Sequence, residues 1–281
     1  MTAEERRRLA IEAALGVAGE LGIGAEGATT LKDSNNTIVK LVPAPIVAKV
    51  GTSHFRDARL ESLERELAVA THLADSGAPV VRPTREVAPG PHHWRDLTLT
   101  LWQYAEPLQG AALRPRELAA VVSAVHEALI DFPSSLPPFT LELEDAKRLA
   151  QPERSPALGP ADRRFLWAVL DELQAAFSTL ATANRPLHGS PHAGNWLATA
   201  EGPLLLDFEA ACMGPIEWDL AALDDETVGI FPDVDDELIA LLRRMRSVCV
   251  AAKCWVEPNR APEVCEAAHV HLKLLRGERL D

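Results

Sequence analysis

The distribution of apolar residues changes about a third of the way along the chain, and this change limits the folds open to it. Between about residues 28 and 105, most apolar residues occur in short runs rich in β-branched side chains, whereas later ones recur mostly at helical spacing. The first three short runs are 28–32, 36–42 and 45–50. The residues between them are rich in Asp, Ser, Asn and Pro, which favour turns, so the sequence predicts an antiparallel meander.

Helices are predicted on both sides of this meander. The first 20 or so residues carry apolar positions at helical spacing, and a second helix is predicted at about 57–75 from a leucine-rich stripe. Two further strands are predicted at 80–87 and 96–104.

The rest of the chain is predicted to be mainly helical. The expected helices are 114–131, 141–151, 160–182, 235–253 and 261–276. A non-helical block at 186–219 interrupts them. A small β-rich part followed by a larger helical part predicts an α+β fold, with domains at 1–105 and 106–281, a joint near 104–109 and a cleft between the two.

Composition excludes several classes of partner. Apolar residues make up 47% of the chain and charged residues 25%, which is typical of a globular protein, and the net charge is −13. Such a charge disfavours nucleic acid and anionic membrane surfaces. No apolar run reaches the ~18 residues of a transmembrane helix, and the charged N-terminus does not look like a secretory signal, so we expect a cytoplasmic protein. The four cysteines contain no C-x-x-C pair, so neither a zinc site nor a redox motif is predicted.

The non-helical block carries the most chemically informative residues. It contains HGSPHAGN, which ends at Asn195, and then LLLDFE, which includes Asp207. An Asn and an Asp on two loops that flank a short hairpin can converge as oxygen ligands for Mg²⁺, which prefers such ligands beside substrate phosphates. The two commonest glycine-rich phosphate-binding motifs are absent from the sequence.

These motifs resemble those of the aminoglycoside phosphotransferase and choline kinase-like family, which consists of small-molecule relatives of the protein kinases. The family pattern is H-G-D-x-H-x-x-N, then [LIV]-[LIV]-D-[FW]-[DE], then G-x-x-x-[WY]-D-[LI]-[AG]. The chain has HGSPHAGN, LLDFE and GPIEWDLAAL in that order. The resemblance implies a protein-kinase-like bilobal fold, with a small antiparallel β-sheet N-lobe that includes one helix and a larger, mainly helical C-lobe.

The resemblance also implies roles for individual residues. Asn195 and Asp207 would hold Mg²⁺ against the nucleotide phosphates, and Lys49 would contact the α- and β-phosphates. Glu66 would be the ion-pair partner of Lys49, with Glu64 as the competing choice. His188 and Asp219 would order the catalytic loop from within the helical lobe.

Adenine would meet the backbone of a hinge at residues 102–106, which includes Gln103 and Tyr104. The nucleotide is expected to be ATP or GTP. The turn over the phosphates would be residues 33–36, which contain no glycine, and we expect Ser34 and Asn35 to contact phosphate through backbone N–H groups.

One departure from the family pattern concerns the reaction itself. Ser190 stands where the family has the catalytic Asp that accepts the proton of the acceptor hydroxyl. Phosphoryl transfer depends mainly on positioning and charge stabilisation, so this loss is expected to cost about 10²–10⁴-fold in rate without abolishing nucleotide or metal binding. His192 or Glu209 is a candidate substitute base.

The sequence therefore predicts an ATP-dependent phosphotransferase that acts on a hydroxyl of a small molecule. An acidic run at 219–237 suits a cationic acceptor such as an amino sugar or an amino alcohol, and it is equally what a solvated acidic loop looks like. The alternative is a pseudokinase that binds nucleotide with weak or no transfer. A serine hydrolase is disfavoured because the sequence lacks the G-x-S-x-G elbow. The sequence leaves the oligomeric state open.

Overall fold

The structure, a computed structural model, describes residues 1–52, 59–178, 180 and 182–278. The chain falls into two compact units, and each is made of two separate stretches of sequence. The first unit is Met1–Ser134 with Ser190–Ala211, and the second is Ser135–Gly189 with Cys212–Asp281. This is a division by packing, and the functional division at residues 105 and 106 stays a prediction.

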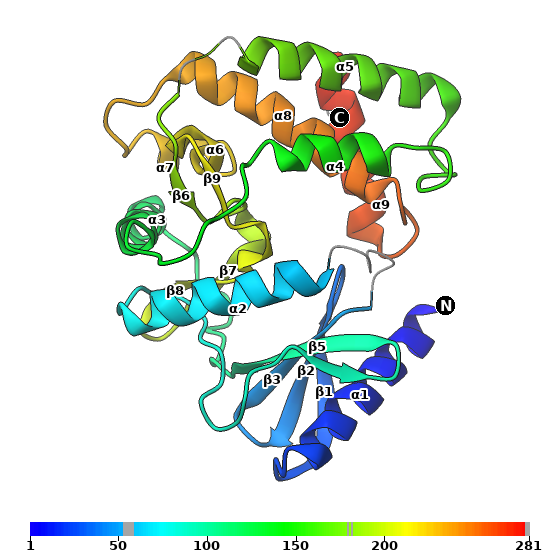
Figure 1. Cartoon of the computed structure of the whole chain (residues 1–281), viewed down its shortest axis with the longest axis vertical. Coiled ribbons are helices and arrows are strands. Elements are labelled where there is room, and N and C mark those ends of the chain that lie inside the picture. The colour runs from blue at the N-terminus through cyan, green and yellow to red at the C-terminus, as the bar shows by residue number, and fades with distance from the viewer. Residues whose placement is uncertain (53–58, 179, 181, 279–281) are drawn as a thin grey trace. The chain divides into compact units, whose positions relative to one another are not determined.

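A five-stranded antiparallel sheet is the base of the first unit (Figure 1). Its strands lie in the order β1-β2-β3-β5-β4. Their bounds are β1 (Ala25–Asp33), β2 (Thr37–Pro43), β3 (Ile46–Val50), β4 (His92–Trp94) and β5 (Leu97–Gln103). The predicted meander is therefore present.

The strand predicted at 80–87 is wrong. This segment makes only isolated bridges, between Val80 and Leu205 and between Pro83 and Trp102. A proline cannot donate to a strand ladder, so Pro83 interrupts the pairing in the middle of the segment. Strand β5 pairs with β3 on one side and with the short β4 on the other, and the sequence of β4, His-His-Trp, shows no apolar alternation.

Helix α1 (Ala3–Glu20) packs against the sheet beside β1 (Figure 1). It begins at a capping box formed by Thr2 and Glu5. Its buried face is made of small residues, which let the helix approach the sheet closely. These are Ala10, Ala13, Ala14, Val17 and Ala18, and they join a core with residues of β2, β3 and β5.

The other elements of the first unit bring distant parts of the chain together. They are α2 (Arg59–Asp75), α3 (Pro115–Leu129), η1 (Ala193–Asn195), the hairpin of β7 (Trp196–Thr199) and β8 (Gly202–Leu205), and η2 (Phe208–Ala210). The backbone N–H of Val81 donates to Leu205, and that of Leu108 donates to Ala198. The stretch 190–211 is thereby joined to the N-terminal part of the chain. Residues 57 and 58, which were predicted to begin the second helix, lie outside the described residues.

The second unit is mainly helical. Its elements are α4 (Leu141–Leu149), α5 (Pro160–Ser178), β6 (Arg185–Leu187), β9 (Cys212–Gly214), α6 (Ile216–Leu220), α7 (Asp225–Val228), α8 (Asp236–Cys254) and α9 (Pro262–Arg276). Helices α4, α5, α6 and α9 all contact α8, which is the central helix of this unit. The strands β6 and β9 pair antiparallel. Helix α5 ends at Ser178, earlier than the predicted residue 182; residues 179 and 181 lie outside the described residues.

Within the described ranges, none of the helices is both long enough and apolar enough to cross a membrane. Cys212 and Cys249 are buried, Cys254 and Cys265 are half-buried, and none of the four belongs to a disulfide among the described residues.

Candidate functional site

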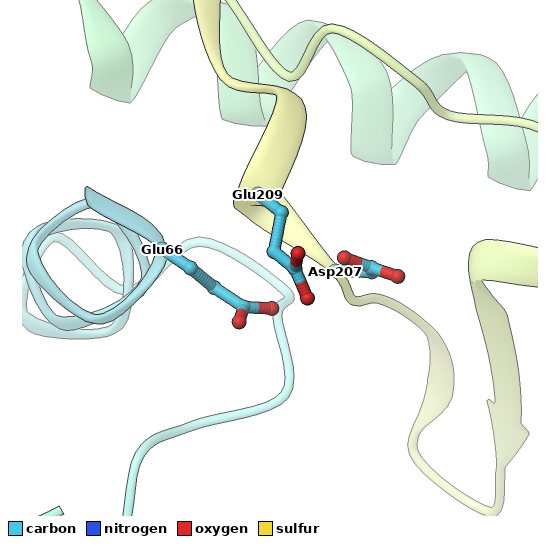
Figure 2. Close-up of side chains that lie close together, drawn as sticks. All are labelled: Glu66, Asp207 and Glu209. Carbon is cyan, nitrogen blue, oxygen red and sulfur yellow. The ribbon is translucent and has the colours of Figure 1, made fainter. Parts of the chain in front are cut away.

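Three carboxylates converge in the first unit. Glu66 comes from α2, while Asp207 and Glu209 come from the segment that follows β8. One carboxylate oxygen of each lies within 4.8 Å of the others. Figure 2 shows the carboxyl groups of the three side chains close together. We call Glu66, Asp207 and Glu209 the carboxylate cluster.

A single buried lysine contacts all three members of the carboxylate cluster. The Nζ atom of Lys49 lies 2.7 Å from Oε1 of Glu66, 3.0 Å from Oδ1 of Asp207 and 2.6 Å from Oε1 of Glu209. Lys49 is only 7% exposed. With all four groups ionised, one positive and three negative charges leave a formal charge of −2, which suits a divalent cation with oxygen ligands.

The shared charges shift two pKa values. Burial acts to lower the pKa of Lys49, but the carboxylates of Asp207, Glu209 and Glu66 outweigh it and raise that pKa well above its ordinary value. Burial raises the pKa of Glu66 to about 8, despite the opposing effect of the Lys49 ammonium, and the charges of Glu209 and Asp207 act in the same direction as burial. Lys49 is therefore positively charged at neutral pH, and Glu66 readily holds a proton.

Regular secondary structure fixes Lys49 and Glu66. Lys49 lies on β3 and is paired with Ile38 of β2 and Thr100 of β5. Glu66 is 1% exposed, whereas Glu64 faces solvent. Of the two glutamates considered in the sequence, Glu66 is thus the one that meets Lys49.

Asp207 lies in a backbone conformation that few non-glycine residues adopt. Its φ of 70° and ψ of 72° are in the left-handed region, which Asp tolerates better than most residues. The αL turn between β8 and η2 directs the chain so that Asp207 and Glu209 both reach Lys49. The side chain of Arg65 donates to the carbonyl of Glu209 (2.6 Å), so α2 also holds this segment through its backbone.

The turn between β1 and β2 reaches the carboxylate cluster through Asn36, which belongs to the predicted turn but was not chosen as a contacting residue. Nδ2 of Asn36 donates to Oε1 of Glu209 at 3.0 Å. Ser34 is half-buried with its backbone N–H bonded to the carbonyl of Asn36, and Asn35 is exposed. Phosphate contacts by Ser34 and Asn35 stay a prediction.

Asn195 is the last residue of η1, and its position relative to Asp207 is set by a backbone contact. Its side-chain Nδ2 donates to the carbonyl of Ser190 at 2.9 Å, so its amide oxygen is the atom that could bind a cation. Its own carbonyl accepts the N–H of Leu206, the residue before Asp207. His192 is exposed, and its Nδ1 accepts the N–H of Gly194.

Asp219 organises the start of the predicted catalytic loop within the second unit. It is fully buried and accepts the backbone N–H groups of His188 (2.9 Å) and Gly189 (2.8 Å). The guanidinium of Arg246 donates to the carbonyls of Gly189 and Trp218. The predicted pair is therefore in contact, and Asp219 acts on the backbone of His188.

The predicted hinge residues Gln103 and Tyr104 follow β5. The N–H of Gln103 donates to the carbonyl of Arg82, and the N–H of Tyr104 donates to the carbonyl of Pro45. Lys40 lies over the ring of Tyr104, 3.5 Å from its centroid. Because these two N–H groups are already bonded within the first unit, an adenine contact at Gln103 or Tyr104 would use other polar groups of these residues.

Comparison with known proteins identifies the family. Residues 29–249 match the model of the phosphotransferase enzyme family. The chain belongs to the phosphotransferase enzyme family. This match covers most of the chain, including Lys49 and all three members of the carboxylate cluster, and confirms the resemblance stated from the motifs. No curated protein sequence matches this phosphotransferase-family chain.

Solved structures confirm the fold class. Amicoumacin kinase hAmiN in complex with AMP-PNP, Ca²⁺ and Ami is similar over 100% of this chain and 98% of its own, with a TM-score of 0.70 and 14% identity. Choline kinase LicA from Streptococcus pneumoniae has a TM-score of 0.65 and 14% identity over 94% and 97% of the two chains. Spectinomycin phosphotransferase APH(9)-Ia with ADP and spectinomycin has a TM-score of 0.63 and 13% identity over 95% and 93%. The phosphotransferase-family chain therefore has an α+β, protein-kinase-like fold.

Proposed function

We propose that this protein is an ATP-dependent phosphotransferase that moves the γ-phosphate to a hydroxyl of a small molecule. The observation that carries the proposal is the contact of one buried lysine, Lys49, with all three members of the carboxylate cluster. A fixed cation beside a group of oxygen ligands is the arrangement that phosphoryl transfer needs, because catalysis there rests on positioning and charge stabilisation.

The donor set fits a divalent cation, with Mg²⁺ as the expected ion. Carboxylate and amide oxygens of Asp207 and Asn195 would hold it, and Glu209 offers a further carboxylate. Bound Mg²⁺ would neutralise charge on the nucleotide phosphates. Lys49 would then exchange part of its contact with Asp207 and Glu209 for phosphate oxygens while Glu66 holds its ammonium in place. The backbone of residues 102–106 would hold adenine or guanine.

Ser190 decides between two candidate functions. Its hydroxyl is not basic near neutral pH, so it can position an acceptor hydroxyl but cannot take its proton as a carboxylate would. His192 and Glu209 stay candidate bases. A pseudokinase that binds Mg²⁺ and ATP without efficient transfer is the second candidate.

The proposed acceptor is a cationic small molecule such as an amino sugar or an amino alcohol. A groove of about 770 Å³ in the second unit is lined by Asp225, Asp233 and Asp236, with Arg243 as the basic residue in its lining. Arg243 contacts Asp225 at 2.6 Å, so negative charge remains in excess in the groove. The similar structures named above include kinases of choline and spectinomycin, which agrees with this class of acceptor. A cytoplasmic location remains part of the proposal.

The test combines nucleotide binding with turnover. Mg²⁺·ATP is expected to raise the melting temperature of the wild type, since a ligand that binds only the folded state stabilises it. A panel of aminated and neutral alcohols is then screened for acceptor-dependent ADP release. Asp207→Ala should lose both effects. Failure of Mg²⁺·ATP to stabilise the wild type would overturn both the enzyme and the pseudokinase.

Ser190→Asp separates the two candidates. A rise in turnover by roughly 10²-fold or more, with the same nucleotide affinity, would show that the serine limits catalysis. A fall would show that the site is built around Ser190. Stabilisation by Mg²⁺·ATP with no ADP release from the wild type across the panel would favour the pseudokinase.

A further inference from the structure

Arg6 occupies an unusual position for an arginine. It is one of three consecutive arginines in α1, but only Arg6 is buried, while Arg7 and Arg8 face solvent. It lies one turn before Ala10 on the same face of the helix, so it begins the stripe that packs on the sheet.

The guanidinium of Arg6 forms a two-point contact with Asp33. Nε lies 2.9 Å from Oδ1 and Nη2 lies 2.8 Å from Oδ2. The side chains are only 6% and 9% exposed. Burying both charges costs desolvation free energy, so a pair of this kind is weak evidence for a stabilising role and is better understood as fixing one conformation. A lysine cannot reproduce the two-point geometry.

Asp33 is the first residue of the turn that the sequence places over the nucleotide phosphates. The hydroxyl of Thr37, just after the turn, also donates to Oδ1 of Asp33 at 2.9 Å. The hydroxyl of Thr37 lies 2.9 Å from that of Thr52 in the interior. Both ends of the turn are thus tied to one carboxylate that Arg6 holds.

The same turn touches the carboxylate cluster at its other end. Nδ2 of Asn36 and Nζ of Lys49 both approach Oε1 of Glu209, at 3.0 and 2.6 Å. Two donors on one oxygen fix the rotation of the Glu209 carboxylate. The orientation of Glu209, a candidate metal ligand, therefore depends on the position of Asn36. The position of Asn36 depends in turn on the conformation of the β1–β2 turn.

We propose that Arg6 is a positioning residue for nucleotide and cation binding: through Asp33 it fixes the β1–β2 turn, so that Asn36 orients Glu209 and the turn is preformed for phosphate. This role rests on the proposed function. It also accounts for a phosphate-covering turn without glycine, because an anchored turn needs less conformational freedom and loses less entropy when ligand binds.

The test compares Arg6→Ala with Arg8→Ala. Arg8 lies on the same helix and forms an exposed i,i+4 pair with Glu12, so it is a matched control. Arg6→Ala is expected to weaken Mg²⁺·ADP binding measured by titration calorimetry about tenfold (about 1.4 kcal/mol) and to raise KM for ATP to a similar extent, with kcat within about twofold. Arg8→Ala should match the wild type. Arg6→Lys, which keeps the charge but not the fork, should fall between them.

A readout without nucleotide makes the role testable on its own. Hydrogen exchange should show faster exchange of the backbone amides of residues 34–37 in Arg6→Ala and in Asp33→Asn, and not in Arg8→Ala. If Arg6→Ala does not fold, Asp33→Asn provides the same exchange measurement. A lower melting temperature with unchanged exchange in the turn and unchanged Mg²⁺·ADP affinity would overturn the proposal. If the wild type binds no nucleotide, the proposed function fails, and exchange in the turn alone decides whether Arg6 fixes it.

Discussion

At the scale of single residues, the site is defined by an imbalance of charge. Glu66, Asp207 and Glu209 share one ammonium, and Glu66 is 1% exposed. A buried site with excess negative charge lowers its free energy either by taking up a proton or by binding a cation. The raised pKa of Glu66, about 8, reflects the first of these two effects, because this carboxylate takes up a proton more readily than usual.

The proton on Glu66 gives a pH-dependent stability of known sign. Its pKa is raised from an ordinary 4.5 to about 8, so between these values the folded state binds more protons than the unfolded state. The free energy of unfolding contributed by Glu66 is therefore fully present below about pH 4.5 and is lost as the pH rises through 8. Glu66→Gln cannot bind this proton, and its stability relative to wild type should increase from pH 5 to pH 8. Urea unfolding of both proteins without Mg²⁺ measures this, and parallel pH curves would contradict it.

The sequence predicted the individual residues of this site better than the contacts between them. Lys49 is one of only six lysines and lies in an apolar strand, which made it recognisable. Glu66 follows Leu63 by three residues on the buried face of α2, a signal that separates it from Glu64. Glu209 was considered only as a base, because no local pattern shows that it turns back to Lys49 and Asn36. Arg6 was not selected, because its burial depends on the register of α1 against the sheet.

At the scale of elements, small residues of α1 let this helix pack closely against the sheet of the first unit. Gly16 of α1 lies against the indole of Trp94 on β4, and a Cβ added there would come 2.2 Å from Nε1 of Trp94. Gly19, one turn later, has nothing within 4 Å of such a Cβ. Substitutions at these two glycines can therefore distinguish the effect of helix propensity from the effect of packing within one helix.

Alanine substitutions at these glycines should have opposite effects. Gly19→Ala is expected to stabilise the protein by about 0.5–1 kcal/mol, because glycine is unfavourable within a helix. Gly16→Ala gains the same propensity but must displace Trp94, so we expect a net loss of about 1–3 kcal/mol. Trp94→Ala in the Gly16→Ala background should recover part of the loss. Thermal or urea unfolding of the four proteins measures both effects, and stabilisation by Gly16→Ala would show that the indole moves at no cost.

The sequence predicted elements where a period or a turn residue marks them. The stripe of α2 and the turns around β2 were visible, whereas the 80–87 segment has strand-like composition but is held by single bridges around Pro83. The three-residue β4 carries no periodic signal at all. Its position depends on pairing with β5, which is a property of the folded unit.

At the scale of the whole molecule, the division into units assigns different groups to different parts of the chain. Lys49, the carboxylate cluster, Asn195 and the β1–β2 turn all belong to the first unit. The acidic groove at 225–243 belongs to the second unit. Binding of the nucleotide and binding of the proposed acceptor molecule should therefore protect different segments of the sequence.

Hydrogen exchange with each ligand alone should reveal this division. Mg²⁺·ADP is expected to slow exchange mainly in 33–50, 59–75, 102–106 and 193–211, because the groups proposed to bind it lie there. An aminated acceptor found in the turnover screen should slow exchange around 225–243. Protection by Mg²⁺·ADP centred on α8 or α9 would contradict the assignment of the nucleotide site.

The first unit is discontinuous in sequence, and this affects how the protein is made on the ribosome. Lys49 and Glu66 are synthesised about 160 and 140 residues before Asp207, a delay of roughly 7–32 s at ~5–20 residues per second. A nascent chain at that stage can form the pair of one ammonium and one carboxylate, which is electrically balanced. The excess negative charge arrives only with the stretch 190–211. The late synthesis of this stretch therefore defers the most unfavourable charges until the sheet and α2 that must hold them have been made.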